Sequence, residues 1–399
     1  MKTMNMTNLK TRTNGLKLGV GALALGVCVA AQAAAPAITN ITMVGTTPQF
    51  RIQSDLGITN QIQYVTNLGQ TNWTVLTNVV VAASPYWFVD VDAPPAPYRF
   101  YRVLALNQTN NPAPTNMALI PAGSFTMGDN FGDGAAVGWP YEVPLHSVYI
   151  SAFYLDRYEV TKALWDEVYN WALTHGYSFE YGALGKAANH PAHTMTWYDA
   201  VKWCNARSEK ENKVPAYYTD AGLSVRYRSG QVAPYVDWGR GYRLATEAEW
   251  EKAARGGASG RRFPWGGTDN ITHSMANYYS STSYAYDTSP TRGYHPDFQA
   301  GGYPYTSPAG YFAPNGYGLY DMAGNVWEWC WDWYDGSWYS NAGATQSDTR
   351  GPTSGSFRVD RGGGWDGYAI HCRAAYRDYY YPADRGNNVG FRSALPPGQ

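Results

Sequence analysis

Hydrophobic and polar positions alternate in short runs between Ile38 and Leu106, and Asn, Gly and Pro separate one run from the next. The runs cover residues 49–53, 61–65, 73–76, 79–82 and 98–104. Alternation with a period of two is typical of strands that bury one face. The pattern therefore predicts a small all-β sandwich over residues 38–106.

The spacing of these runs resembles immunoglobulin and fibronectin III domains, on strand spacing alone. No catalytic constellation lies within them, so the expected role of this module is that of a spacer or an adhesive domain. Residues 107–115 are polar and carry two prolines, which is typical of a linker.

From residue 116 to residue 396 the pattern changes to short strands, helices and long loops rich in Gly and Tyr. Apolar residues with helical spacing follow Thr161, and a second helix is predicted from Thr196. The clearest helix start is a capping box at Thr246 and Glu249, in which each side chain satisfies the other residue's free amide. Glu247 and Glu249 are therefore interpreted as structural acids at a helix start, where they complement the dipole, and not as a catalytic pair.

Residues 1–33 have the pattern of an export signal. Basic residues come first, an apolar run covers 18–31, and Ala31 and Ala33 form a small-x-small cleavage site. The run is short for a membrane span, although a single N-terminal anchor is the alternative. We expect a mature protein without a stable membrane span that is secreted, periplasmic or held at the cell surface.

Composition narrows the choice of partner. The chain has 399 residues, enough for two or three domains, with a net charge of -1 and only 15% charged residues. This balance gives no general attraction for nucleic acid or anionic membranes. The 34 Tyr, 16 Trp and 42 Gly indicate a loop-rich fold packed by large rings. Surfaces of this composition often bind ligands, and the alternative is that most of these rings belong to the core.

Phrases in a fixed order mark the region after residue 116. They are IPAGSFTMG at 120–128, YEVT at 158–161, YRLATEAEWE at 242–251, FPWG at 263–266, NGYGLYDMAGNVWEW at 315–329, RGGGW at 361–365 and VGFR at 389–392. Together they resemble the formylglycine-generating enzyme, or sulfatase-modifying factor, family. The resemblance implies an α+β fold of the C-type-lectin-like kind with little regular secondary structure and with structural calcium.

The family's enzymes oxidise a substrate cysteine with copper and oxygen through two closely spaced cysteines after a Gly-Gly-Ser phrase. In this chain Gly364 replaces that serine, the position of the first cysteine falls on Gly367, and the second has no cysteine counterpart. Since Cu(I) selects soft thiolate ligands, copper is not expected. The resemblance thus implies a member without the catalytic pair. A copper-dependent oxidase acting on exported sulfatases, and a cysteine-independent enzyme, are the alternatives.

Other site residues also follow from the resemblance. It places calcium on Asp321, Gly324, Val326 and Glu328, which offer two carboxylates and two main-chain carbonyls. The alternative for Glu328 is a turn-capping acid. The resemblance also favours a disulfide between Cys330 and Cys372, with Cys204 left as a buried thiol.

The resemblance implies that residues 365–388 form the solvent-facing surface on which the family's enzymes hold a substrate peptide. Tyr and Asn offer contact area with few rotatable bonds and adaptable hydrogen bonds, as in antibody paratopes. We therefore expect a ligand-binding face for a peptide, protein or glycan, although half of these rings would be accounted for by inward packing. The residues assigned to this face are Trp365, Asp366, Tyr368, His371, Tyr379, Tyr380, Tyr381 and Asp384.

Overall fold

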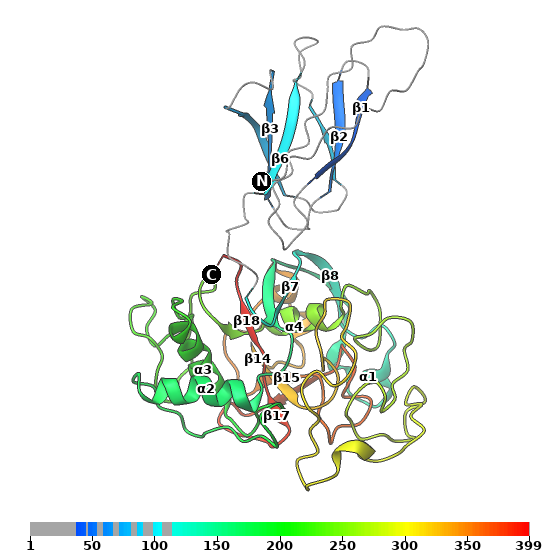
Figure 1. The fold of residues 1–399 in the computed structure, drawn as a ribbon. Helices are drawn as coiled ribbons and strands as arrows, with labels where there is room; N and C mark the ends of the chain where they lie inside the picture. Colours follow the sequence, from blue (N-terminus) through cyan, green and yellow to red (C-terminus); the bar gives the residue numbers. More distant parts are fainter. Residues whose placement is uncertain are drawn as a thin grey trace, which may run out of the picture. The chain divides into compact units, whose positions relative to one another are not determined.

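A computed structural model describes residues 37–44, 47–53, 59–66, 72–80, 86–90, 99–105 and 114–398. Contacts divide the chain into two compact units, 1–107 and 108–399, which are treated separately below (Figure 1). The predicted export signal at 1–33 lies outside the described residues, as does the predicted linker except for its last two positions. Within the described part, no helix combines the length and the apolar character needed to cross a bilayer.

In the first unit the alternating runs form strands in two antiparallel sheets. The strands are β1 (Ala37–Val44), β2 (Thr47–Gln53), β3 (Thr59–Val65), β4 (Thr74–Val80), β5 (Tyr86–Val89) and β6 (Phe100–Ala105). One sheet has the order β1-β2-β5 and the other β4-β3-β6. Phe50 of the first sheet and Tyr101 of the second lie 4.9 Å apart in a shared core. The likeness to immunoglobulin or fibronectin III domains stays a prediction.

The second unit contains a four-stranded antiparallel sheet of order β13-β18-β10-β7 that includes its first and last strands. These strands are β7 (Met117–Ile120), β10 (Phe153–Asp156), β13 (Arg243–Leu244) and β18 (Ser393–Leu395). Leu119 and Leu395 both lie opposite Tyr154, on either side of β10. The first and last strands of the unit therefore flank the same central strand.

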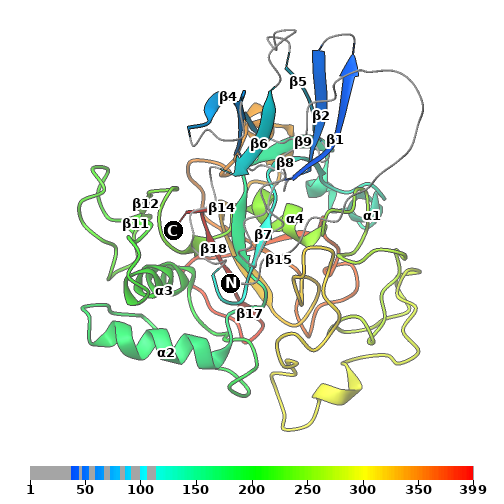
Figure 2. The same ribbon diagram turned by 45° about the horizontal axis from the view of Figure 1, so that its top comes forward.

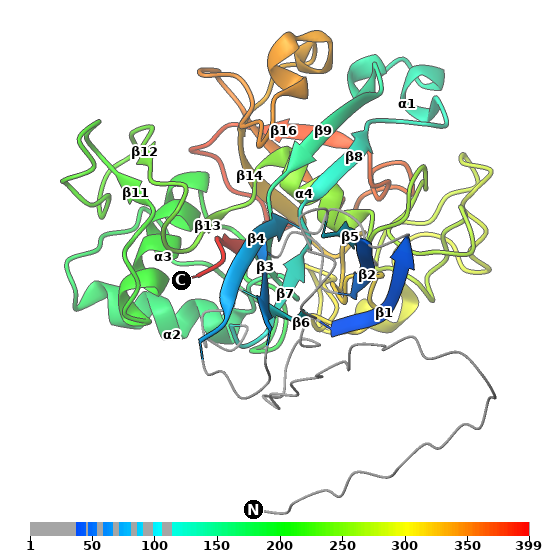
Figure 3. The same ribbon diagram turned by 90° about the horizontal axis from the view of Figure 1, so that it is seen from above.

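A second four-stranded sheet has the order β16-β15-β14-β17, with β17 parallel to β14 and the other pairs antiparallel. Its strands are β14 (Trp327–Trp333), β15 (Arg358–Arg361), β16 (Arg377–Tyr380) and β17 (Val389–Gly390). Two separate pairs complete the strands: β8 (Gly123–Met127) with β9 (His146–Ile150), and β11 (Tyr217–Tyr218) with β12 (Tyr235–Val236). The β8–β9 pair packs against α4 (Glu247–Ala254), which Figure 3 shows from above.

The predicted helix starts are confirmed. Thr161 caps α2 (Lys162–Leu173), and Thr196 caps α3 (Trp197–Lys210), which packs beside α2 (Figure 2). At α4 the capping box is present: Glu249 N donates to the Thr246 hydroxyl at 3.2 Å, and Thr246 N donates to the Glu249 carboxylate at 2.9 Å. The remaining helical turns are α1 (Asp133–Ala136), η1 (Pro140–Glu142), η2 (Pro296–Phe298), η3 (Trp338–Ser340) and η4 (Ala342–Thr345).

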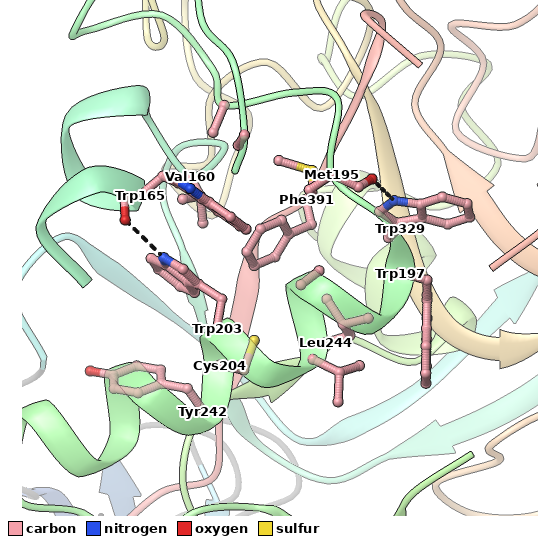
Figure 4. Packing of buried hydrophobic residues seen from close by; sticks show 14 of the residues in the cluster. Val160, Trp165, Met195, Trp197, Trp203, Cys204, Tyr242, Leu244, Trp329 and Phe391 are labelled. Carbon is pink, nitrogen blue, oxygen red and sulfur yellow. Dashed lines mark hydrogen bonds between the residues drawn. The ribbon is translucent and has the colours of Figure 1, made fainter. Parts of the chain in front are cut away.

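Large rings form the core between the two helices and the sheets (Figure 4). Trp165 of α2 and Trp203 of α3 stack at 5.8 Å, and the Trp203 indole nitrogen donates to the Trp165 carbonyl at 3.2 Å. Phe391 meets Trp203 edge-on at 5.3 Å. Ring packing of this kind buries much apolar area with few residues, which suits a unit with short helices and strands.

Candidate ligand-binding site

The turn after β15 begins the predicted ligand face and depends on glycine. Gly362 and Gly363 have φ angles of 93° and 77°, in the left-handed region that side chains disfavour. A Cβ at Gly363 would lie 3.0 Å from the main-chain carbon of His371. The two glycines therefore let residues 364–371 fold back on themselves at the end of the sheet.

Trp365 lies beneath the surface and not on it. Only 3% of its surface is exposed, which corrects the expectation that it belongs to the solvent-facing set. Its ring lies 5.4, 5.5 and 5.8 Å from Tyr303, Tyr305 and Tyr294, and its indole nitrogen donates to the Asn387 carbonyl at 3.4 Å. Trp365 thus supports the rings above it.

The three rings on Trp365 are part of a continuous group of rings in contact with one another, which we call the tyrosine face. Its members are Tyr279, Tyr284, Tyr294, Tyr303, Tyr305 and Tyr368. Tyr303 is 61% exposed and stacks on Tyr305 at 4.3 Å. Tyr368 is 43% exposed and meets Tyr279 edge-on at 5.3 Å. Exposed rings held by their neighbours lose little entropy when they bind a ligand.

Of the six residues of the tyrosine face, only Tyr368 was predicted from the sequence to belong to a ligand-binding surface. The other members lie between residues 279 and 305, a stretch whose density of tyrosine was a usable signal. The packing of Tyr294, Tyr303 and Tyr305 against Trp365 depends on a loop path that short-range patterns do not specify.

Two polar residues stand beside the face. Both carboxylate oxygens of Asp366 accept from the Asn388 amide, at 3.2 and 3.0 Å. Partial burial raises the pKa of Asp366 despite that hydrogen bond. His371 Nδ1 accepts from the Tyr368 amide at 3.1 Å, and burial lowers the pKa of His371 to about 4, so its ring is neutral at pH 7.

Gly364 and Gly367, the positions that the resemblance assigns to the family's serine and first cysteine, are closely packed. A Cβ at Gly364 would lie 3.0 Å from Asp366 Oδ1 and 3.1 Å from the Trp327 ring. A Cβ at Gly367 would lie 3.2 Å from His371 Nδ1 and from Gly364 N. Both separations are shorter than ordinary carbon contacts. The local packing is therefore fitted to glycine.

The remaining predicted residues belong to β16 and the turn after it, and they contact different rings. Tyr379 lies 4.8 Å and Tyr381 4.3 Å from Phe357. Tyr380 points to the other side of the strand, with its ring 6.1 Å from Trp329. Asp384 is exposed at the turn. The predicted set thus forms two groups, one at the tyrosine face and one along β16.

The predicted disulfide is wrong: Cys204, Cys330 and Cys372 are free, buried thiols. Each lies in a different hydrophobic cluster, and Cys204 is seen within its cluster in Figure 4. Burial raises the pKa of all three thiols. Cys330 and Cys372 flank separate cores, so sequence order alone could not place them within bonding distance.

The predicted calcium ligands fit a cation unequally. Asp321 keeps a buried oxygen, Oδ1, without a hydrogen-bond partner among the described residues, and it lines a cavity of about 20 Å³, room for one water molecule or ion. Glu328 has no free oxygen, because Arg392 donates to both at 2.6 and 2.7 Å and the Trp250 indole donates at 2.7 Å. Glu328 is therefore the partner of Arg392 in a buried ion pair, and not the turn-capping acid considered as the alternative.

The main-chain positions of this set lie beside a third buried acid. Val326 N donates to Glu159 Oε1 at 3.2 Å, and Gly324 N donates to the Gly362 carbonyl at 2.8 Å. Burial, together with the charges of Asp321 and Glu328, raises the pKa of Glu159. The neighbouring acids Asp321 and Glu328 thus disfavour ionisation of Glu159. The described residues nevertheless contain no group of three or more His, Cys, Asp or Glu arranged to hold a metal.

Comparison with known proteins identifies the second unit. The family model described as "Sulfatase-modifying factor enzyme 1-like domain" matches residues 103–396. Formylglycine-generating enzyme of Thermomonospora curvata is 35% identical over 309 residues, covering 70% of this chain and 93% of that enzyme. Serine/threonine-protein kinase pkn1 of Chlamydia pneumoniae is 31% identical over 300 residues, covering 71% of this chain and 38% of the kinase.

A solved structure agrees with these matches. Treponema denticola variable protein 1 superposes with a TM-score of 0.53 at 29% identity, covering 70% of this chain and 95% of that protein. The predicted family is confirmed, and the mixed fold with few helices is consistent with its C-type-lectin-like architecture.

Proposed function

Because the chain belongs to the family of sulfatase-modifying factor enzyme 1-like domains, we propose that it uses the family's fold to bind a peptide or glycan and not to oxidise a cysteine. The observation that carries this proposal is the position of the thiols. The three cysteines of the described residues are buried in separate clusters, and glycine occupies the position that the resemblance assigns to the first catalytic cysteine. A Cu(I) site needs thiolates that converge, which these do not.

The tyrosine face supports the binding role. Its rings are partly exposed yet fixed by edge and stacking contacts, and the Asp366–Asn388 pair beside them supplies acceptors and a donor. Aromatic platforms next to directed polar groups recognise both sugar rings and peptide side chains. The predicted residues along β16 form a second group with ring contacts of its own.

The test is binding of the purified chain to arrays of glycans and of peptides, followed by titration of the best ligand. Tyr303→Ala and Tyr368→Ala should each weaken binding about ten-fold, since a buried aromatic contact contributes more than 1 kcal/mol. Tyr235→Ala, an equally exposed tyrosine on β12, is the matched control and should bind as the unaltered chain does. Unchanged affinity of both face variants would refute the proposal.

The oxidase alternative is supported by the names of two curated relatives, which are formylglycine-generating enzymes. It is tested by incubating copper-loaded protein with a Cys-x-Pro-x-Arg peptide and searching for formylglycine by mass spectrometry. Recovery of that product would overturn the binding proposal.

We also propose structural calcium, held by Asp321 with the carbonyls of Gly324 and Val326, since these supply the hard oxygen ligands that calcium prefers. Glu328 is left out because its oxygens are occupied by Arg392 and Trp250. Calcium should raise the melting temperature of the unaltered chain and not that of Asp321→Asn. Equal shifts would exclude this assignment.

Export through residues 1–33 remains part of the proposal, supported by their basic, apolar and small-residue order. Sequencing the amino terminus of the protein recovered from its host tests it. A mature terminus at Ala34 is expected, and an intact Met1 would contradict it.

A further inference from the structure

One row of side chains crosses three strands on one face of the β16-β15-β14 sheet. Trp329 of β14 lies opposite Asp360 of β15, and Asp360 lies opposite Asp378 of β16. Directly opposed residues share a face, and so do residues two apart, which places Tyr380 on the same side. Two carboxylates therefore stand side by side between aromatic rings.

Neither carboxylate has a cationic partner among the described residues. Asp360 is only 3% exposed, and its Oδ1 has no hydrogen-bond partner there. Asp378 Oδ1 accepts from the Tyr379 amide at 2.9 Å. Like charges directly opposite each other destabilise a sheet, and a buried carboxylate without a partner costs more.

The arginines of these strands are committed elsewhere. Arg361 and Arg377 extend from the other face, where they bind Glu251 and Glu247. Arg358 shares the face of the acids, but its guanidinium lies over the Trp333 and Trp197 rings at 3.5 and 3.8 Å. The protein thus keeps its own cations away from the acidic pair.

Rings border the pair on both sides. Trp329 lies opposite Asp360, and Tyr380 follows Asp378 on the same face with its ring 6.1 Å from Trp329. Carboxylates among aromatic faces are the surroundings that an organic cation prefers, because it gains ion pairing and cation–π attraction together. A divalent metal wants more protein ligands than two, and no third metal-binding side chain gathers here within the described part of the chain.

The pair is reachable from outside. β16 is an edge strand of its sheet, Tyr380 is 38% exposed and Asp378 is partly exposed. A long side chain that passes over β16 can therefore contact Asp378, which lies opposite the buried Asp360.

We propose that Asp360 and Asp378 form an acidic subsite that receives the guanidinium or ammonium group of an arginine or lysine side chain in a peptide ligand. This inference rests on the proposed binding function and narrows its ligand class to basic peptides. Arginine suits the site best, since its planar group pairs with carboxylates and stacks on rings in one orientation.

The experiment compares two peptides with the full chain, acetyl-Gly-Gly-Arg-Gly-Gly-amide and the same peptide with citrulline, which is neutral and nearly the same shape. Calorimetry should show at least about ten-fold tighter binding of the arginine peptide. The double variant Asp360→Asn/Asp378→Asn should lose this preference, whereas Asp166→Asn, an acid on the surface of α2, should keep it. Equal binding of the two peptides by the unaltered chain, or a preference retained by the double variant, overturns the inference.

Two further measurements act as controls. The first distinguishes loss of the subsite from misfolding, and the second distinguishes failure of the acidic subsite from failure of the proposed binding function. Tyr380→Ala changes only an exposed ring and should reduce the preference for arginine while the melting temperature stays within a few degrees of the unaltered chain. A ligand from the arrays that depends on Tyr303 but not on Asp360 and Asp378 would leave the binding function standing and refute the basic-peptide subsite. Arginine selectivity without any dependence on Tyr303 would support the acidic subsite and refute the role assigned to the tyrosine face.

Discussion

Asp332 shows how strongly this fold perturbs single side chains. It is buried on β14, and its Oδ2 accepts from the main-chain amide of Glu247 at 2.7 Å. Burial and the charge of Glu247 raise the pKa of Asp332 to about 8. The folded protein therefore holds this acid protonated at neutral pH, whereas the unfolded chain ionises it.

This difference predicts a pH dependence. Since the folded pKa exceeds the unfolded one, the contribution of Asp332 to stability is complete below about pH 4 and is lost as the pH rises through about 8. Asp332→Asn keeps an oxygen for the Glu247 amide and should flatten that loss. Urea unfolding of both proteins between about pH 5 and pH 9 measures it. Parallel curves would contradict the assigned pKa.

Restoring the family's cysteine at position 367 should not restore chemistry. In Gly367→Cys the added Cβ meets His371 Nδ1 and Gly364 N at 3.2 Å, so we expect a loss of about 1 kcal/mol or more in unfolding free energy. One thiol also leaves copper without its second sulfur. Unfolding and a formylglycine assay test both statements, and Gly367→Ala separates crowding from sulfur chemistry. A stable, active variant would contradict both expectations.

At the scale of elements, α4 joins the two large sheets through buried ion pairs. Glu247 binds Arg377 of β16, Glu249 binds Arg243 of β13, and Glu251 binds Arg361 of β15. Three glutamates at alternate positions of α4 thus pair with arginines in two different sheets. These buried pairs fix the orientation of the helix relative to both sheets.

Removing one partner of such a pair should be costly. Arg377→Met leaves Glu247 buried with the longer ion pair to Arg361, at 3.4 Å, and we expect a loss of about 3 kcal/mol. The double variant Arg377→Met/Glu247→Gln should recover part of it. Lys162→Met, which breaks the exposed pair with Asp166, should cost less than about 1 kcal/mol. Similar losses for the buried and the exposed pair in urea unfolding would contradict this ranking.

Elements differ in how far the sequence predicts them. The helix starts at Thr161, Thr196 and Thr246 depend on contacts within three residues, and they were predicted. The opposed acids Asp360 and Asp378 were missed, because antiparallel register is set by the whole sheet. Trp365 was placed on the surface for a related reason: the tyrosines that cover it are at least 60 residues earlier in the chain.

At the scale of the whole molecule, the three thiols report on the integrity of the three hydrophobic clusters of the second unit at once. A chain without residues 1–33 has three cysteines, one in each hydrophobic cluster of the second unit. A thiol reagent should label about none of them in the native protein and all three in denaturant, because burial keeps them protonated. Reductant should leave the melting temperature unchanged. A fall would indicate a disulfide that the structure lacks.

The arrangement of β7 and β18 around β10 has a topological consequence. Strands on either side of one strand lie about 10 Å apart, so the second unit begins and ends at nearly one place. A polypeptide with adjoining ends can be circularly permuted: joining residue 398 to residue 116 through a few glycines, and opening the chain in an exposed loop, should preserve the native contacts. The same adjacency lets such a unit be inserted into an unrelated host protein while straining neither partner.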